Sequence, residues 1–306
     1  MTVTCLFVGL ATLDVIQLVE RPPTANEKTV ALDSTLAAGG PAANAAVVAA
    51  HLGATVTLVT TLARGPIANI IRGDLEARRV TVRDVQTDAD AVVASILVSR
   101  GSGERAVVSP TARASVASAR PLDPGDVEGL LDGVGAVQLD GYHPAVALPI
   151  VAAARARGIP VVVDLGSFKP YSPEVLRSST VAVVSRDFSP PGVGRDASAV
   201  LEYLRDHGVE GVAVTRGAEG IVVPDGTVMV EPVSAVDTCG AGDFFHGALT
   251  HRIAQCGWDS HRFTSDLAFA AQVAGTSVQS FGTRAWLDGW VPPTQEARPV
   301  GVPRPR

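Results

Sequence analysis

The sequence contains little cysteine, and this excludes several classes of protein. Its 306 residues include only Cys5, Cys239 and Cys256, an odd number without the spacing of a metal site. Disulfide scaffolds and zinc modules need more cysteines at regular spacing, so we expect reduced thiols and a cytoplasmic protein. The N-terminal segment has no basic residue before Asp14, which argues against a signal peptide.

Charge is also sparse, and basic charge forms no cluster. The 25 Lys and Arg and 31 Asp and Glu residues give a formal net charge of −6, so neither a nucleic-acid partner nor an anionic membrane is expected. Residues 34–63 carry no charged side chain, a length that would allow a membrane span. The stretch contains Gly39-Gly40-Pro41, Asn44 and His51, so we interpret it as loop, buried helix and strand.

Several well-known catalytic motifs are missing as well. The chain has no G-x-x-x-x-G-K-[ST] phosphate loop, no G-x-G-x-x-G after its first apolar run, no G-x-S-x-G and no H-E-x-x-H. These absences argue against P-loop enzymes, dinucleotide-binding folds, serine hydrolases of the elbow type and zinc proteases. The six histidines show no metal-ligand spacing either.

Apolar patterns that alternate between helix and strand are abundant. Hydrophobic residues make up 46% of the chain and charged residues 18%, which supports a large core. Strands are expected at 5–10, 55–63, 135–141, 159–166, 180–185 and 211–217. Helices are expected at 41–53, 66–79, 123–132, 144–158, 172–178, 196–208, 241–256 and 260–280. This order predicts an α/β fold with a mostly parallel sheet, whose ligands bind at the carboxyl ends of the strands.

Three segments interrupt the alternation. Residues 91–110 and 28–37 favour hairpins that form a small accessory β layer, and residues 220–231 favour a hairpin around Asp225-Gly226. The tail at 291–306 is rich in proline, which predicts poor order.

Glycine gathers in three short segments, "AAGGPAAN" (37–44), "VTRGAEG" (214–220) and "DTCGAGD" (237–243). The first and last open expected helices, whose N-terminal N–H groups and partial positive charge attract anions. Glycine there lets a ligand contact the backbone directly. Each segment alone could equally be a capped turn.

Taken together, these segments resemble a known family. "GAGDFFHGAL" and "GGPAANAA" are similar to the two signature segments of the ribokinase-like sugar kinases, the phosphofructokinase-B family, and the resemblance extends from residue 5 to about 285. It is strongest to ketohexokinase-like members. It implies a three-layer α/β fold over residues 1–290, with a central mostly parallel sheet and a small β lid formed by the segments near 28–37 and 91–110. It also implies ATP-dependent phosphorylation of a sugar hydroxyl with Mg²⁺.

The resemblance assigns catalytic roles to the segment that opens the helix at 241. Asp243 would be the general base that takes the proton of the sugar hydroxyl. The backbone N–H groups of Gly240, Ala241 and Gly242 would form an anion hole for the transferred phosphate. The alternative is that Asp243 only caps its helix.

The resemblance also implies a sugar site. Asp14, expected just after the first strand, would bind sugar hydroxyls together with Gly39, Gly40 and Asn44. The alternatives are a loop aspartate for Asp14 and a helix-capping role for Asn44. Arg105 would reach the substrate from the lid, or it is a solvated hairpin charge.

A nucleotide site is implied on the opposite side. Thr215, Gly217 and Gly220 match the family's phosphate- and ribose-contacting loop. Asp187 lies just after a strand, where the family often has an acid that orients magnesium, either directly or through water.

Some residues depart from the family pattern. "SRDF" replaces the common Asn-x-x-Glu, Pro41 stands where ketohexokinase-like members have a sugar-contacting Asn, and "QSFG" (279–282) replaces a Gly-x-x-Gly turn. Fructose preference and monovalent-cation binding therefore stay open. Two alternative functions also stay open: a nucleoside kinase, and a catalytically silent sugar- or nucleotide-binding regulator of the same fold. The lid, as in many relatives, is expected to form a homodimer.

Overall fold

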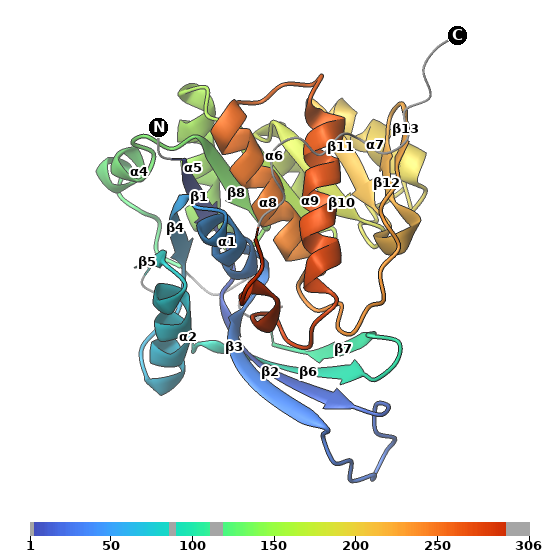
Figure 1. Cartoon of the computed structure of the whole chain (residues 1–306). Coiled ribbons are helices and arrows are strands. Elements are labelled where there is room, and N and C mark those ends of the chain that lie inside the picture. Colours follow the sequence, from blue (N-terminus) through green and yellow to red (C-terminus); the bar gives the residue numbers. More distant parts are fainter. Residues whose placement is uncertain (1–2, 86–89, 111–118, 292–306) are drawn as a thin grey trace.

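The protein is described from a computed structural model, in which residues 3–85, 90–110 and 119–291 are defined. Its centre is a nine-stranded sheet in the order β13-β12-β11-β10-β9-β8-β1-β4-β5 (Figure 1). The strands are β1 (Thr4–Val8), β4 (Thr55–Thr60), β5 (Val80–Asp84), β8 (Ala136–Leu139), β9 (Val161–Leu165), β10 (Val181–Ser185), β11 (Gly211–Thr215), β12 (Ile221–Val223) and β13 (Gly226–Val228). Neighbouring strands from β5 to β11 pair in parallel, and β12 and β13 add an antiparallel edge.

The central strands are apolar because both faces of the sheet are covered. β9 reads VVVDL and is buried along its whole length. Alternate residues of β1 enter opposite cores, Cys5 and Phe7 on one face and Leu6 and Val8 on the other. This is the pattern of a parallel sheet between two helical layers.

Helices form the two outer layers (Figure 1). One core contains residues of α1 (Pro41–His51), α2 (Pro66–Ala77), α8 (Ala241–Cys256) and α9 (Phe263–Ser277). The other contains residues of α4 (Pro124–Leu130), α5 (Pro144–Ala156), α6 (Ser172–Arg177) and α7 (Ala197–Asp206). The three-layer α/β fold expected from the sequence is thus confirmed. Among the described residues, no helix is both long and apolar enough to cross a bilayer.

Helices α1 and α8 pack unusually closely at one point. A Cβ atom at Gly247 would lie 2.3 Å from the carbonyl oxygen of Ala45, so only glycine fits there. The contact is one helical turn from Asp243 and one residue from Asn44. It therefore brings together the first turns of two helices that are far apart in the chain. Asn44 and Asp243, one from each turn, are separated by 199 residues.

A second, four-stranded sheet projects from the main body in the order β3-β2-β6-β7 (Figure 1). Its strands are β2 (Thr12–Val19), β3 (Asp33–Gly39), β6 (Val92–Ser99) and β7 (Arg105–Val108). We call this sheet the lid. Ile16, Ile96 and Val98 form its small core with Cys239.

The lid corrects two expectations. Asp14 was expected just after the first strand, with a loop aspartate as the alternative, but residues 12–19 form β2, so Asp14 lies within a lid strand. Asp14 lies on the better covered face of β2 with Thr12 and Ile16, whereas Gln17 lies on the opposite, partly covered face. The expected strand at 28–37 begins only at Asp33 and continues to Gly39. Of the expected tail at 291–306, the residues from 292 onward lie outside the described part.

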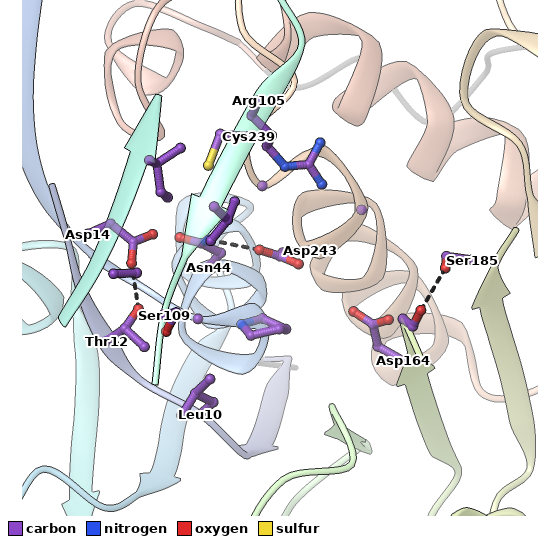
Figure 2. A pocket seen from close by; sticks show the side chains of 18 of the residues that line it. Leu10, Thr12, Asp14, Asn44, Arg105, Ser109, Asp164, Ser185, Cys239 and Asp243 are labelled. Atoms are coloured by element: carbon purple, nitrogen blue, oxygen red, sulfur yellow. Dashed lines mark hydrogen bonds between the residues drawn. The ribbon is translucent and has the colours of Figure 1, made fainter. Parts of the chain in front are cut away.

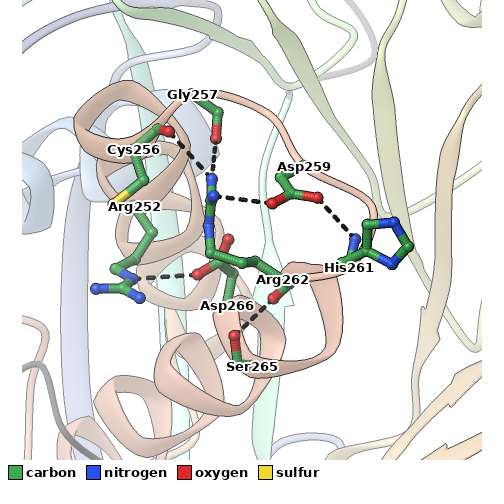
Figure 3. A network of polar contacts seen from close by, with 8 residues as sticks. All are labelled: Arg252, Cys256, Gly257, Asp259, His261, Arg262, Ser265 and Asp266. Carbon is green, nitrogen blue, oxygen red and sulfur yellow. Dashed lines mark hydrogen bonds and ion pairs between the residues drawn. The ribbon is translucent and has the colours of Figure 1, made fainter.

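Arginine–aspartate pairs hold the C-terminal end of α8 against the start of α9 (Figure 3). Arg262 donates to the carbonyl oxygens of Cys256 and Gly257 and to Asp259 Oδ2 at 2.9 Å. Arg252 Nε lies 3.2 Å from Asp266 Oδ1, and both side chains are largely buried. This end of α8 is thereby fixed, while its N-terminal end opens toward the lid.

Candidate active site

A cavity of about 410 Å³ lies where the lid meets the carboxyl ends of the central strands (Figure 2). The strand ends contribute Leu10, Asp164, Gly166, Ser185, Asp187 and Thr215. The lid contributes Thr12, Asp14, Ala94, Ile96, Arg105, Val107 and Ser109. The segments that open α1 and α8 contribute Gly40, Pro41, Asn44, Cys239, Gly240, Gly242, Asp243 and His246, and Tyr142 completes the wall.

Most of the predicted site residues therefore converge on one cavity. The lining includes Asp14, Gly40, Asn44, Arg105, Asp187, Thr215, Gly240, Gly242 and Asp243. Four predicted residues do not line the cavity, namely Gly39, Ala241, Gly217 and Gly220. Gly39 and Ala241 are next in the chain to residues that line the cavity. Gly217 and Gly220 follow Thr215, which also lines it.

Asp243 lies in the first turn of α8 and points into the cavity (Figure 2). Asn44 Nδ2 donates to Asp243 Oδ2 at 2.8 Å. Burial and the nearby Asp164 carboxylate raise the pKa of Asp243 to about 7, against the opposing effects of Asn44, Arg105 and His246. A carboxylate whose pKa lies near neutrality is suited to accept a proton.

The N-terminus of α8 leaves backbone donors directed at the same space. Gly240 takes the helix-capping position with φ 75°, and no side chain caps the helix, so Asp243 is not a capping residue. The Ala241 amide makes only a long 3.4 Å contact with the Thr238 carbonyl oxygen. A Cβ at Gly242 would meet no atom within 4 Å. A helix N-terminus without a side-chain cap, its partial positive charge and the open space at Gly242 together make an anion-binding position.

Asp14 is the buried carboxylate on the lid side of the cavity. Thr12 Oγ1 donates to Asp14 Oδ1 at 2.6 Å. Burial raises the pKa of Asp14, and the Thr12 hydrogen bond and Arg284 oppose this rise. The neighbouring strand passes directly beneath the carboxylate, since a Cβ at Gly39 would lie 1.9 Å from Asp14 Oδ2. Glycine at position 39 is therefore required for Asp14 to keep its place.

We expect Gly39→Ala to displace the Asp14 carboxylate, because the new methyl group would occupy the position of that carboxylate. The KM for the phosphoryl acceptor should rise by roughly tenfold, a change typical of one misplaced polar contact, while the KM for ATP stays within about twofold. Steady-state kinetics with each substrate varied in turn would check this. A Gly73→Ala variant is the control, because a Cβ there meets nothing within 4 Å. Equal KM changes for both substrates would contradict the expectation.

Asn44 does not cap α1. Gly40 is the capping residue and no side-chain cap is present. The Asn44 amide instead donates to Asp243 and accepts from Arg284 Nη1 at 3.0 Å. Its NH₂ group thus bonds the carboxylate of Asp243 in α8, a contact that was not predicted from the sequence.

Arg105 extends from the lid hairpin toward α8. Its Nη1 donates to Thr238 Oγ1 at 3.2 Å, and its side chain lines the cavity while remaining exposed. Thr238 also bonds the Gly103 carbonyl oxygen through its amide and its hydroxyl, at 3.1 Å and 2.8 Å. The tip of the lid is therefore tied to the loop that precedes the anion-binding turn.

The predicted nucleotide-side residues lie at the ends of β10 and β11. Thr215 ends β11, and Gly217 and Gly220 follow with φ values of 59° and 96°. A Cβ at Gly220 would lie 2.7 Å from the Val228 carbonyl oxygen, so this glycine is needed for the turn itself. Asp187 is exposed and lies 3.5 Å from Arg195 Nη1. Within the described residues no group of three or more His, Cys, Asp or Glu could hold a metal on its own.

Sequence reasoning missed several polar residues of the cavity, among them Asp164 and His246. His246 Nδ1 lies 2.7 Å from the Gly242 carbonyl oxygen and 3.3 Å from Asp164 Oδ2, and its Nε2 lies 3.0 Å from the Val183 carbonyl oxygen. The signals were available: Asp164 is the one charged residue in an apolar strand, and His246 lies one turn after Asp243.

Comparisons with known proteins place this arrangement in a family. The model of the pfkB family of carbohydrate kinases matches residues 4–288. Ribokinase of Bacillus subtilis is 25% identical over 289 residues, with 92% of this chain and 94% of the relative covered. Ketohexokinase of Mus musculus is 23% identical, with 88% and 94% covered.

Solved structures share the fold. Ribokinase of Arabidopsis thaliana in complex with ribose and ATP superposes with a TM-score of 0.72 at 23% identity, with 92% of this chain and 94% of that chain covered. Ribokinase of Giardia lamblia superposes with a TM-score of 0.76 at 18% identity, with 94% and 96% covered. Since the family model spans nearly the whole chain, the protein belongs to the pfkB family of carbohydrate kinases.

Proposed function

We propose that the protein is an ATP-dependent kinase that transfers the γ-phosphate to a hydroxyl of a small sugar, with Asp243 as the general base. The observation that carries the proposal is the position of Asp243, in the first turn of a helix whose N-terminus has no side-chain cap and lines the same cavity. A proton acceptor and an anion site are thus side by side, as transfer of a phosphoryl group to an alcohol requires. A ketohexose is one candidate substrate.

In this mechanism the sugar lies between the lid and α1. Asp14 and Arg105 bind its hydroxyls or orient it, and Asn44 supports the base. The reacting hydroxyl gives its proton to Asp243 while its oxygen bonds to the γ-phosphorus. The bond from that phosphorus to the β–γ bridging oxygen breaks, and ADP leaves. The amides of Gly240, Ala241 and Gly242 stabilise the charge on the transferred group.

ATP would extend from the anion-binding turn toward Thr215, Gly217 and Gly220. Mg²⁺ usually binds one or two carboxylates together with substrate phosphates and water. The exposed carboxylate of Asp187 at the cavity wall fits such a role, directly or through water. When bound, the ion would neutralise phosphate charge. We place the enzyme in the cytoplasm, in keeping with three cysteines that are all free.

A substrate panel tests the proposed function. Purified protein with ATP and Mg²⁺ is offered pentoses, ketohexoses, aldohexoses and nucleosides, and ADP release is measured. We expect ADP release with at least one sugar and none with nucleosides. Faster turnover of a nucleoside would favour the nucleoside kinase, and binding without any turnover would favour a silent regulator.

We also propose a homodimer formed through the lid, because apolar side chains are exposed on it. Leu36 of β3 and Val108 of β7 are 58% and 75% exposed. Light scattering at micromolar concentration should give twice the monomer mass of 31.5 kDa. A Leu36→Lys/Val108→Glu double variant should give the monomer mass, because charges on an apolar interface oppose association. A wild-type monomer would contradict the proposal.

A further inference from the structure

The buried residue Arg284 lies behind the active site and joins three elements. Only 8% of the residue is exposed. Its Nη1 donates to Asn44 Oδ1 of α1 at 3.0 Å, its Nε lies 3.2 Å from Asp74 Oδ2 of α2, and its Nη2 donates to the carbonyl oxygen of Ala38 in β3. A guanidinium group inside a protein is held by such acceptors, so these contacts fix its position.

Arg284 determines which way the Asn44 amide faces. A guanidinium only donates hydrogen bonds, so the Asn44 oxygen must face Arg284. The Asn44 NH₂ group then faces Asp243 Oδ2, at 2.8 Å. The opposite orientation of the amide would set an oxygen against the carboxylate and an NH₂ group against the guanidinium. Asn44 is therefore a donor to Asp243 because Arg284 makes it one.

The same arginine is connected to the lid. Asp74 Oδ2 accepts from the Ala38 amide at 3.0 Å, while Arg284 donates to the carbonyl oxygen of the same residue. Both polar backbone groups of Ala38 are thus held by the Arg284–Asp74 pair. Gly39, the next residue, is the one that lies against the Asp14 carboxylate.

We propose that Arg284 is a positioning residue for phosphoryl transfer. It holds Asn44 in the orientation that supports Asp243, and it anchors the lid strand beside Asp14. The inference rests on the proposed role of Asp243 as the base. It assigns to Arg284 no contact with either substrate.

Arg284→Gln tests this role through kinetics. We expect kcat to fall by about tenfold or more, as misplacement of a reacting group does, while the KM for ATP stays within about twofold. Loss of the Asn44 donor should also move the acidic limb of the kcat/KM profile to higher pH, because that hydrogen bond lowers the pKa of Asp243. The other charged groups near Asp243, which are Asp164, Arg105 and His246, are unchanged in the variant. Arg284→Lys keeps a positive charge but loses the forked donors of the guanidinium group, so its kcat should lie between those of the wild type and Arg284→Gln.

Arg252→Gln is the matched control. It also removes an Arg Nε–Asp pair of 3.2 Å, between α8 and α9, but it touches no residue of the cavity. We expect it to lower the thermal midpoint and to leave kcat and the pH profile unchanged. Equal kcat losses in the two variants would reduce Arg284 to a structural residue and overturn the proposal.

A double-mutant cycle separates action through Asn44 from any other effect. In an Asn44→Ala background, Arg284→Gln should change kcat by less than about twofold, since residues that act in one network are not additive. Full additivity would overturn the proposal, as would an Arg284→Gln enzyme with wild-type kcat and pH profile. Asp243→Asn is assayed in parallel. If that variant stays active, the base assignment fails, whereas an inactive Asp243→Asn with an unaffected Arg284→Gln rejects only the inference about Arg284.

Discussion

Asp243→Asn should lose about 100- to 10,000-fold of kcat, the range expected when a general base is removed. Asparagine keeps the shape of the side chain but cannot take the proton of the sugar hydroxyl. Binding should change far less, because Gly240, Gly242 and Asp14 still meet the substrates, and interactions confined to the transition state affect kcat rather than affinity. Steady-state kinetics and calorimetric titration with ATP and sugar measure the two effects.

The pH profile of the wild type should identify the same group. With a pKa of about 7, Asp243 is protonated and unable to act as a base in acid. The kcat/KM of the wild type should therefore fall about tenfold per pH unit below pH 7, as for one essential ionised group. The residual activity of Asp243→Asn should lack this limb.

The same substitution should raise the melting temperature of the protein above neutral pH. Burial raises the pKa of Asp243 from 3.8 to about 7, so ionisation of the carboxyl costs folding free energy. This cost grows as pH rises from about 4 to 7 and is complete above pH 7. An asparagine side chain does not ionise, so the Asp243→Asn variant should melt above the wild type at pH 8, by a margin that shrinks at pH 5.

Asp196→Asn is the control, because Asp196 is an exposed aspartate whose side chain caps a helix. Asp196 Oδ1 accepts from the Ala199 amide at the start of α7 and does not line the cavity, and Asn caps a helix equally well. This variant should keep the kcat of the wild type. If Asp243→Asn keeps more than about a tenth of wild-type kcat, which lies outside the expected loss, Asp243 is not the base.

Asp14→Ala should raise the KM for the sugar and leave the KM for ATP nearly unchanged. The carboxylate is buried, fixed by Thr12 and Gly39, and faces the cavity from the lid. A site built to bind a hydroxyl loses roughly 1–3 kcal/mol when one partner is removed, which corresponds to about 5- to 150-fold in kcat/KM for the sugar.

A matched variant distinguishes lost binding from a disturbed lid. Thr12→Val removes the donor to Asp14 but keeps the carboxylate and the volume of the side chain, so its effect on the sugar KM should be smaller than that of Asp14→Ala. Isothermal titration with sugar alone should give the same order of affinities. Equal losses for sugar and ATP in Asp14→Ala would show that Asp14 only supports the lid.

The sequence predicted the central sheet well because its strands are short valine-rich runs between helices that end in glycine. It predicted the convergence of Asp14, Asn44 and Asp243 on one cavity because each lies near a strand's carboxyl end or a helix start. β2 was missed since the buried Asp14 and the partly exposed Gln17 lie on opposite faces, so polar residues interrupt both faces and no regular alternation marks the strand.

The partners of Asn44 were beyond sequence reasoning for a different reason. Arg284 is separated from Asn44 by 240 residues, and no local pattern distinguishes a buried arginine from a solvated one. The role of Asn44 as a donor to Asp243 depends on that arginine, so the family resemblance alone pointed to a sugar contact. Only the tertiary arrangement of α1, α2 and β3 reveals the polar chain.

The close contact of Gly247 with the carbonyl oxygen of Ala45 limits how such enzymes can be recombined. The part of the chain that carries the sugar-side loop and the part that carries the base pack against each other at this glycine, with no space for a methyl group. A chimera that joins the first half of one relative to the second half of another must therefore keep glycine at position 247, whatever residue stands at position 45, because the clash is with backbone atoms. A larger residue at position 247 would push α1 away from α8 and separate Asn44 from Asp243, leaving a protein that has every catalytic side chain but not their mutual geometry.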